Sequence, residues 1–174
     1  MNLQEQLLQE HSKANTALMV AWIGHNPKRF ATLMHFFLQG KNKEAQRSAW
    51  VMSYCIEAHP NLILPYISAI FARCLEPNTH PALKRNTTRA LQFASIPEAD
   101  HALAINCCFD WLQDPNEPVA IRCFSMSIIA QLSTYYPELK NELKQIIESA
   151  LQYEVPSPAF KAHSKKILKG LNKR

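Results

Sequence analysis

The sequence predicts an all-α protein built as a stack of helical hairpins, an α-α superhelix. Short segments recur with a period of about 36 to 38 residues, a length typical of helical repeats. Within each period the apolar residues are spaced by four, as on one face of a helix. The chain also has three glycines against eleven prolines, whereas strand-rich folds use more glycine in their turns. We therefore expect helices punctuated by proline and no extensive sheet.

Three markers define the repeat, and they occur in the same order in each unit. An asparagine comes first, an arginine follows within a few residues, and a proline comes next. Proline is favoured at the first position of a helix, where its missing N–H costs nothing. The proline therefore predicts the start of the second helix of each hairpin. The markers are Asn42, Asn78 and Asn116; Arg47, Arg85 and Arg122; and Pro60, Pro97 and Pro137.

A weaker unit precedes the marked ones. Residues 3–24 are expected to be helical with a break near Ser12. Asn26 can cap a following helix that Pro27 opens, and Gly40 can stop it. These features predict a first hairpin over about residues 3–39.

Three further hairpins follow, at about residues 42–76, 80–113 and 117–152. Ten residues after each marker proline lies an apolar residue, Ile70, Cys107 or Ile147, within a stripe that should face neighbouring helices. The expected first helices are 42–58, 80–94 and 117–135, and the expected second helices are 61–75, 98–112 and 137–152.

A last helix is expected as a cap over about residues 157–172, with Phe160, Ile167 and Leu171 on one side. No long linker or low-complexity segment interrupts the sequence. A single hairpin buries too little apolar surface to be stable alone, so the hairpins should share a continuous core. We therefore expect one repeat domain over residues 1–174.

Two of the segments resemble a known family. Residues 114–122, with the sequence DPNEPVAIR, look like the first-helix opening of HEAT repeats. Residues 59–67, HPNLILPYI, are similar to the opening of the second helix. The resemblance covers roughly residues 42–152 and implies an α-solenoid of the armadillo/HEAT superfamily, with two ridges of helices. It implies no particular reaction.

The charge is unevenly distributed. The formal net charge is +5, but residues 155–174 alone carry six basic side chains and no acid, which leaves −1 for the rest. We interpret this as a nearly neutral stack ending in a basic cap. A solvated helix end explains the lysines most simply, and contact with a polyanion is the alternative. The cap lysines considered as contacts are Lys161, Lys165, Lys166 and Lys169.

No familiar catalytic or metal motif is present in the sequence. The glycines form no phosphate-binding loop, and the histidines form no His-Glu-x-x-His pair. One metal cluster, His101 with Cys107 or Cys108 and Asp110, is less favoured than a surface histidine near buried thiols. The five cysteines are expected to be reduced core residues. We predict no catalytic residue, no cofactor and no metal.

The repeated arginines, with Arg89 and Trp50 beside them, are candidate contacts for a partner or a phosphate. If they faced solvent together they would form a basic stripe. In HEAT repeats such an arginine commonly links neighbouring repeats instead, and the resemblance favours that role. The candidates from this group are Arg47, Trp50, Arg85, Arg89 and Arg122.

Two functions are compatible with these observations. The favoured hypothesis is a non-enzymatic scaffold that binds another protein or peptide, because the sequence indicates a repeat core without a convergent set of catalytic residues. A cytoplasmic location is expected, because the N-terminus lacks a signal-peptide pattern and no apolar run is long enough for a membrane span. The alternative is a DNA-binding protein similar to the HEAT-like alkylpurine DNA glycosylases, suggested by the basicity and by Asp110-Trp111. Nucleic acid is the less favoured partner because the basic residues lie mostly in one terminal helix. An oligomerisation module is a third possibility.

Overall fold

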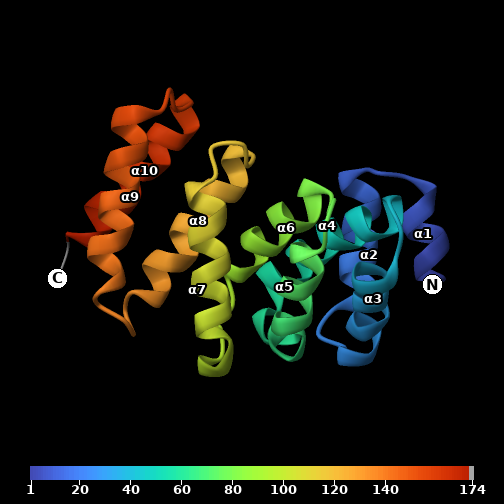
Figure 1. The fold of residues 1–174 in the computed structure, drawn as a ribbon. Coiled ribbons are helices and arrows are strands. Elements are labelled where there is room, and N and C mark those ends of the chain that lie inside the picture. The colour runs from blue at the N-terminus through green and yellow to red at the C-terminus, as the bar shows by residue number, and fades with distance from the viewer. Residues whose placement is uncertain (173–174) are drawn as a thin grey trace. The chain divides into compact units, whose positions relative to one another are not determined.

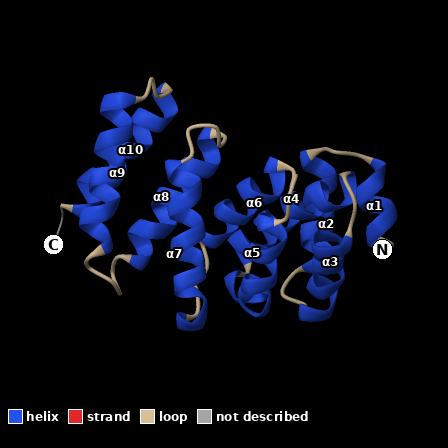
Figure 2. Cartoon of the chain, viewed as in Figure 1, coloured by secondary structure: helices blue, strands red, loops and turns tan. Residues whose placement is uncertain are grey.

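The computed structural model describes residues 1–172, and this part of the chain consists of helices and loops (Figures 1 and 2). The all-α fold class predicted from the sequence is confirmed. The helices are α1 (Leu3–Gln9), α2 (Lys13–Ile23), α3 (Pro27–Gln39), α4 (Lys43–Ala58), the 3-10 helix η1 (Pro60–Tyr66), α5 (Ile67–Leu75), α6 (Pro81–Leu91), α7 (Glu98–Gln113), α8 (Val119–Leu132), α9 (Leu139–Tyr153) and α10 (Pro158–Leu171).

The chain forms two compact units, Met1–Glu98 and Ala99–Arg174. The N-terminal unit holds α1 to α6, and within it α4 packs against α2, α3 and α6. In the C-terminal unit α8 packs against α9 and α10. The boundary falls inside the hairpin expected at residues 80–113, and one domain over residues 1–174 stays a prediction.

Side-chain caps explain where the N-terminal helices begin. The expected break near Ser12 is confirmed, because the Ser12 hydroxyl accepts a hydrogen bond from the Asn15 backbone N–H at 3.1 Å. Asn26 caps α3 as expected by accepting from the backbone N–H groups of Lys28 and Arg29. Such caps satisfy N–H groups that have no partner inside the helix.

The asparagine marker has a backbone explanation at two of its three positions. Asn42 and Asn78 adopt φ values of 44° and 60°. Asparagine tolerates this left-handed region better than most residues, because its short amide can bond locally. These two asparagines therefore lie in tight turns just before the first helices of their hairpins. The Asn42 side chain does not cap α4 by a hydrogen bond.

The prolines divide one expected helix. Residues 61–75 were expected to form a single second helix, but η1 covers Pro60–Tyr66 and α5 starts only at Ile67. Pro65 cannot donate a backbone hydrogen bond, and its ring crowds the preceding turn. The segment winds into a tighter 3-10 turn before the regular helix begins.

The apolar stripe faces the core at its central positions. Ile70, Cys107 and Ile147 are all buried, at most 3 % exposed. The stripe drifts at its start, where Ala99 is exposed, because a spacing of four does not match 3.6 residues per turn. All five cysteines are buried free thiols, as the sequence predicts.

Candidate functional site

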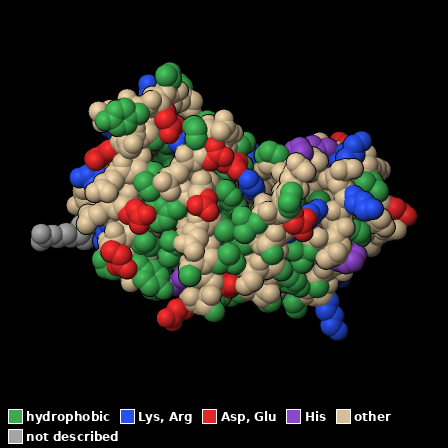
Figure 3. Space-filling view, in the orientation of Figure 1, with side chains coloured by type: hydrophobic (Ala, Val, Ile, Leu, Met, Phe, Trp, Pro, Cys, Tyr) green, Lys and Arg blue, Asp and Glu red, His purple; other side chains and the backbone are tan. Residues whose placement is uncertain are grey.

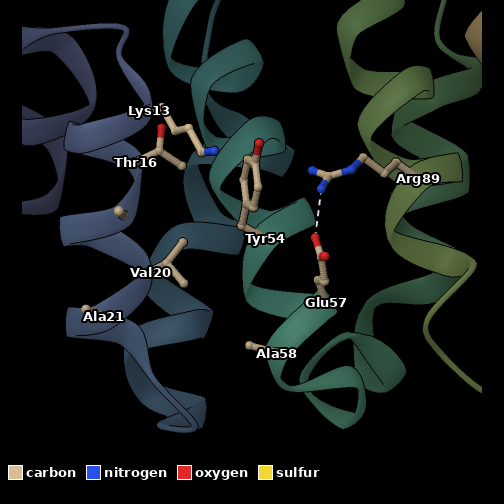
Figure 4. A pocket seen from close by; sticks show the side chains of 9 residues that line it. Lys13, Thr16, Val20, Ala21, Tyr54, Glu57, Ala58 and Arg89 are labelled. Carbon is tan, nitrogen blue, oxygen red and sulfur yellow. Dashed lines mark hydrogen bonds and ion pairs between the residues drawn. The ribbon is translucent and has the colours of Figure 1, made fainter.

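A groove of about 620 Å³ lies in the N-terminal unit between α2, α4 and α6 (Figure 4). Its size falls in the range of about 300–1,000 Å³ that ligand sites occupy. One part of the lining is small and apolar, and another part is charged and aromatic. The lining residues are Lys13, Thr16, Ala17, Val20, Ala21, Tyr54, Glu57, Ala58 and Arg89.

The apolar part comes from the outer face of α2 and the end of α4. Ala17 and Ala21 lie one turn apart on α2, and both are exposed, as is Ala58 on α4. Val20 is half-buried between them. Because alanine side chains are short, another chain can approach the helix backbone closely along this wall.

The charged part is built around Tyr54 on α4. The Arg89 guanidinium lies over the Tyr54 ring, 4.3 Å from its centroid. Arg89 Nη1 donates to the Ser53 hydroxyl at 2.9 Å, and its Nη2 donates to a Glu57 carboxylate oxygen at 2.7 Å. Stacking and two hydrogen bonds fix the orientation of this guanidinium.

Lys13 approaches Tyr54 from the other side. In Figure 4 its side chain extends from the start of α2 toward Tyr54, while Arg89 extends from α6. Lys13 is exposed, and no ion pair joins it to another described residue. The groove therefore holds two cations and a single carboxylate, that of Glu57.

Two of the marker arginines are occupied inside their own units. Arg47 Nη1 donates to the Leu7 carbonyl at 2.6 Å, which ties α4 to α1. Arg122 is only 5 % exposed; its Nε donates to the Leu112 carbonyl at 2.8 Å, and its two Nη atoms bond both oxygens of Glu154 at 2.7 and 2.9 Å. These contacts match the linking role that the family resemblance implies.

The middle marker arginine behaves differently. Arg85 is exposed on α6, and Arg89, one turn later, makes the polar link to α4. The spacing of the markers identified the helix but not the arginine that reaches the neighbouring helix. Within the N-terminal unit, Arg47 and Arg89 thus bond neighbouring helices, whereas Arg85 is exposed.

Trp50 is a half-buried residue of α4. Its ring packs against His11 with centroids 4.3 Å apart and lies 6.1 Å from the ring of Tyr54. It therefore supports the helix that carries the groove residues and is not among the residues that line the groove.

The candidate lysines of α10 are all exposed: Lys161, Lys165, Lys166 and Lys169. The rest of the C-terminal unit is acidic, since residues 99–154 carry eight acids and three basic residues, a net −5. Acidic side chains are visible over α7 and α9 in Figure 3. Residues 1–98 carry ten basic and six acidic residues, a net +4. The near neutrality of residues 1–154 is thus the sum of two opposite charges. Lys173 and Arg174 lie outside the described residues.

His101 is not the surface histidine that the sequence suggested. It is 4 % exposed, and its Nδ1 lies 3.1 Å from the Tyr136 hydroxyl. Within residues 1–172, no three His, Cys, Asp or Glu side chains converge to hold a metal ion. Burial, and then the charge of Asp110, raise the pKa of Cys107 to about 11, so its thiol stays protonated at neutral pH.

The fold and the comparisons agree on the class of protein. A family model described as a HEAT repeat domain matches residues 3–171, so the chain belongs to the HEAT repeat family of all-α helical-repeat proteins. The match extends past both ends of the region, about 42–152, in which the repeat was recognised from the sequence. No curated protein and no solved structure matches the chain.

Of the residues that line the groove, only Arg89 was a candidate from the sequence. Lys13, Tyr54 and Glu57 were not predicted, because they belong to two helices whose packing side by side is not visible in the sequence. One usable sequence feature was the alanine-rich outer face of α2, where Ala14, Ala17 and Ala21 would share a helix face with no charge between them.

Proposed function

We propose that this protein is an interaction scaffold that binds a segment of another protein in the groove between α2, α4 and α6. The observation that carries the proposal is the groove itself, in which an exposed small-residue wall runs beside a fixed aromatic and charged cluster. An apolar surface with a few oriented polar groups is the usual composition of a specific binding site. The match to the HEAT repeat domain supports the same class of function.

The shape of the lining favours a polypeptide. Ala17, Ala21 and Ala58 leave the wall shallow, so the backbone of a helix or an extended segment can lie against it. Tyr54 and Arg89 are types of residue that contribute strongly to the binding energy at protein interfaces. Arg89 is already oriented by its partners, which lowers the entropic cost of binding.

A library of random peptides displayed on phage tests this proposal. Peptides selected on the native protein are measured against two variants with one added indole each, Ala17→Trp in the groove and Ala162→Trp on the exposed face of α10. We expect Ala17→Trp to weaken binding at least about tenfold by filling the groove, and Ala162→Trp to leave it unchanged. Peptides that bind all three proteins equally would contradict the proposal.

DNA binding is the second candidate function, and the four exposed lysines of α10 favour it. A lysine face would neutralise phosphates and give a steep dependence of affinity on salt. Against it, the remainder of the same unit is acidic. Titration of a labelled duplex at low salt tests this alternative, followed by an assay for release of an alkylated base. We expect no binding that depends on the α10 lysines.

A cytoplasmic location is also part of the proposal, supported by five buried free thiols. Among the described residues, none of the helices combines the length and the apolar character needed to span a membrane. Fractionation of the native cells with an antibody against the protein would test the location.

A further inference from the structure

We infer that the groove recognises an acidic side chain next to a small apolar one, and that Glu57 occupies the anion position until the partner arrives. This inference rests on the proposed function, because it assigns the chemistry of the segment bound in the same groove. It follows from the charges around Tyr54 and from their present hydrogen bonds.

The two cations of the groove converge on one place. Lys13 and Arg89 reach toward Tyr54 from α2 and α6, on opposite sides of the α4 helix that carries the ring (Figure 4). A carboxylate placed beside the Tyr54 hydroxyl would accept hydrogen bonds from cationic donors. Bonds of this kind are stronger than those between neutral groups. The groove thus has two cationic donors for the one carboxylate, that of Glu57, that it contains.

Glu57 is well placed to give way to that anion. Its side chain is 45 % exposed, and it bonds Arg89 from the solvent side through one oxygen. An exposed ion pair of this kind contributes little stability, about 0–1 kcal/mol. Arg89 would remain in position without Glu57, because the Ser53 hydroxyl and the Tyr54 ring also hold it. An incoming carboxylate therefore meets an oriented guanidinium.

The apolar neighbour of the acidic side chain follows from the rest of the lining. Val20, Ala21 and Ala58 lie farther along the groove than Lys13 and Tyr54 (Figure 4). This surface matches a short apolar side chain one or two positions from the acid. The net charge of +4 on residues 1–98 adds attraction for an acidic segment at longer range.

The test compares matched peptides by fluorescence anisotropy at two salt concentrations. A peptide selected on the groove is measured together with copies in which each Asp or Glu is replaced in turn by Asn or Gln. We expect one such replacement to weaken binding about tenfold, and the acidic peptide to lose affinity at higher salt.

Variants of the protein locate the effect. Lys13→Ala should weaken the acidic peptide several-fold but leave its amide copy almost unchanged, whereas Glu57→Gln should strengthen the acidic peptide, by roughly threefold to tenfold. Lys28→Ala removes another exposed lysine of the same unit and serves as the control for general charge.

The outcomes separate the two proposals. If peptides bind in the groove, as Ala17→Trp reports, but every amide copy binds as well as its parent, the inference about the acid is wrong and the proposed function stands. If Glu57→Gln weakens the acidic peptide, Glu57 is a contact and not a placeholder, which also overturns the inference. If no peptide is sensitive to Ala17→Trp, the proposed function itself fails.

Discussion

Arg122 makes hydrogen bonds through all three of its guanidinium nitrogens. It joins the end of α7 to the turn between α9 and α10, and its guanidinium also lies 4.5 Å from the centroid of the Phe160 ring. Because the Arg122 side chain is 6 % exposed, water cannot take its place as a hydrogen-bond donor to the Leu112 carbonyl. This residue should matter for stability and not for partner binding.

Replacing Arg122 by alanine should destabilise the protein by about 2–3 kcal/mol, because the Leu112 carbonyl and Glu154 lose charged hydrogen bonds. Urea unfolding followed by circular dichroism measures the change. Lys144→Ala is the control, since its pair with Glu148 is exposed and should contribute about 0.5 kcal/mol or less. Equal losses of stability in the two variants would show that the buried hydrogen bonds of Arg122 contribute no more to stability than an exposed ion pair.

The five thiols should react slowly with a disulfide reagent in the native protein. Burial raises the pKa of Cys55 to about 12 and that of Cys123 to about 11, which keeps the reactive thiolate scarce. We expect little reaction of native protein at pH 8 and complete reaction of five thiols in denaturant, measured by absorbance. Rapid reaction of the native protein would contradict the buried positions of these residues.

At the scale of elements, α10 depends on a histidine for part of its packing. The His163 Nε2 lies 3.0 Å from the Ser127 hydroxyl of α8. Burial, and then the positive charge of Lys166, lower the pKa of His163. The folded state thus favours the neutral imidazole.

The stability of the C-terminal unit should therefore fall as the pH drops through 6.5 and below. The unfolded chain binds a proton at His163 before the folded chain does, so acid favours unfolding. Urea unfolding at pH 7.5 and pH 5.5 should show a smaller loss of stability in His163→Gln than in the native protein. His25→Gln, at an exposed position, should retain the native pH dependence. A native pH dependence in His163→Gln would contradict this account.

Some helix starts could be predicted from the sequence, and others could not. The caps at Ser12 and Asn26 were predictable because capping depends on residues within one turn. The 3-10 start at Pro60–Tyr66 was not predicted, since a proline is tolerated in a first turn and also in a 3-10 segment. That Arg89 and not Arg85 bonds α4 could not be predicted, because it depends on how α4 and α6 pack against each other.

At the scale of the whole molecule, the two compact units should respond separately to a local lesion. In Arg122→Ala, amide hydrogen exchange should accelerate in α8, α9 and α10, because these helices share the lost contacts. In α3 and α4 the protection should be nearly unchanged, since contacts in repeat proteins are mainly between neighbours. Hydrogen exchange followed by mass spectrometry measures both regions, and equal loss of protection throughout would indicate one cooperative unit.

The repeat architecture was predictable because each marker is local and recurs, whereas the groove was not. Lys13 and Arg89 are separated by 75 intervening residues, and only the packing of α2 and α6 on either side of α4 places them at one site. The basic C-terminal segment was recognised from the sequence, but the opposite charges of residues 1–98 and 99–154 were not. The sum over residues 1–154 concealed a basic N-terminal unit and an acidic segment that the boundary at Glu98 separates.

We propose that a partner segment binds along α2, α4 and α6. Backbone amide shifts of the isotope-labelled protein, recorded during titration with a groove-selected peptide, test this claim most directly. We expect the largest changes at Ala17, Ala21 and Ala58, with small changes in α10. Changes concentrated at Lys161, Lys165 and Lys169, with an unperturbed groove, would contradict it.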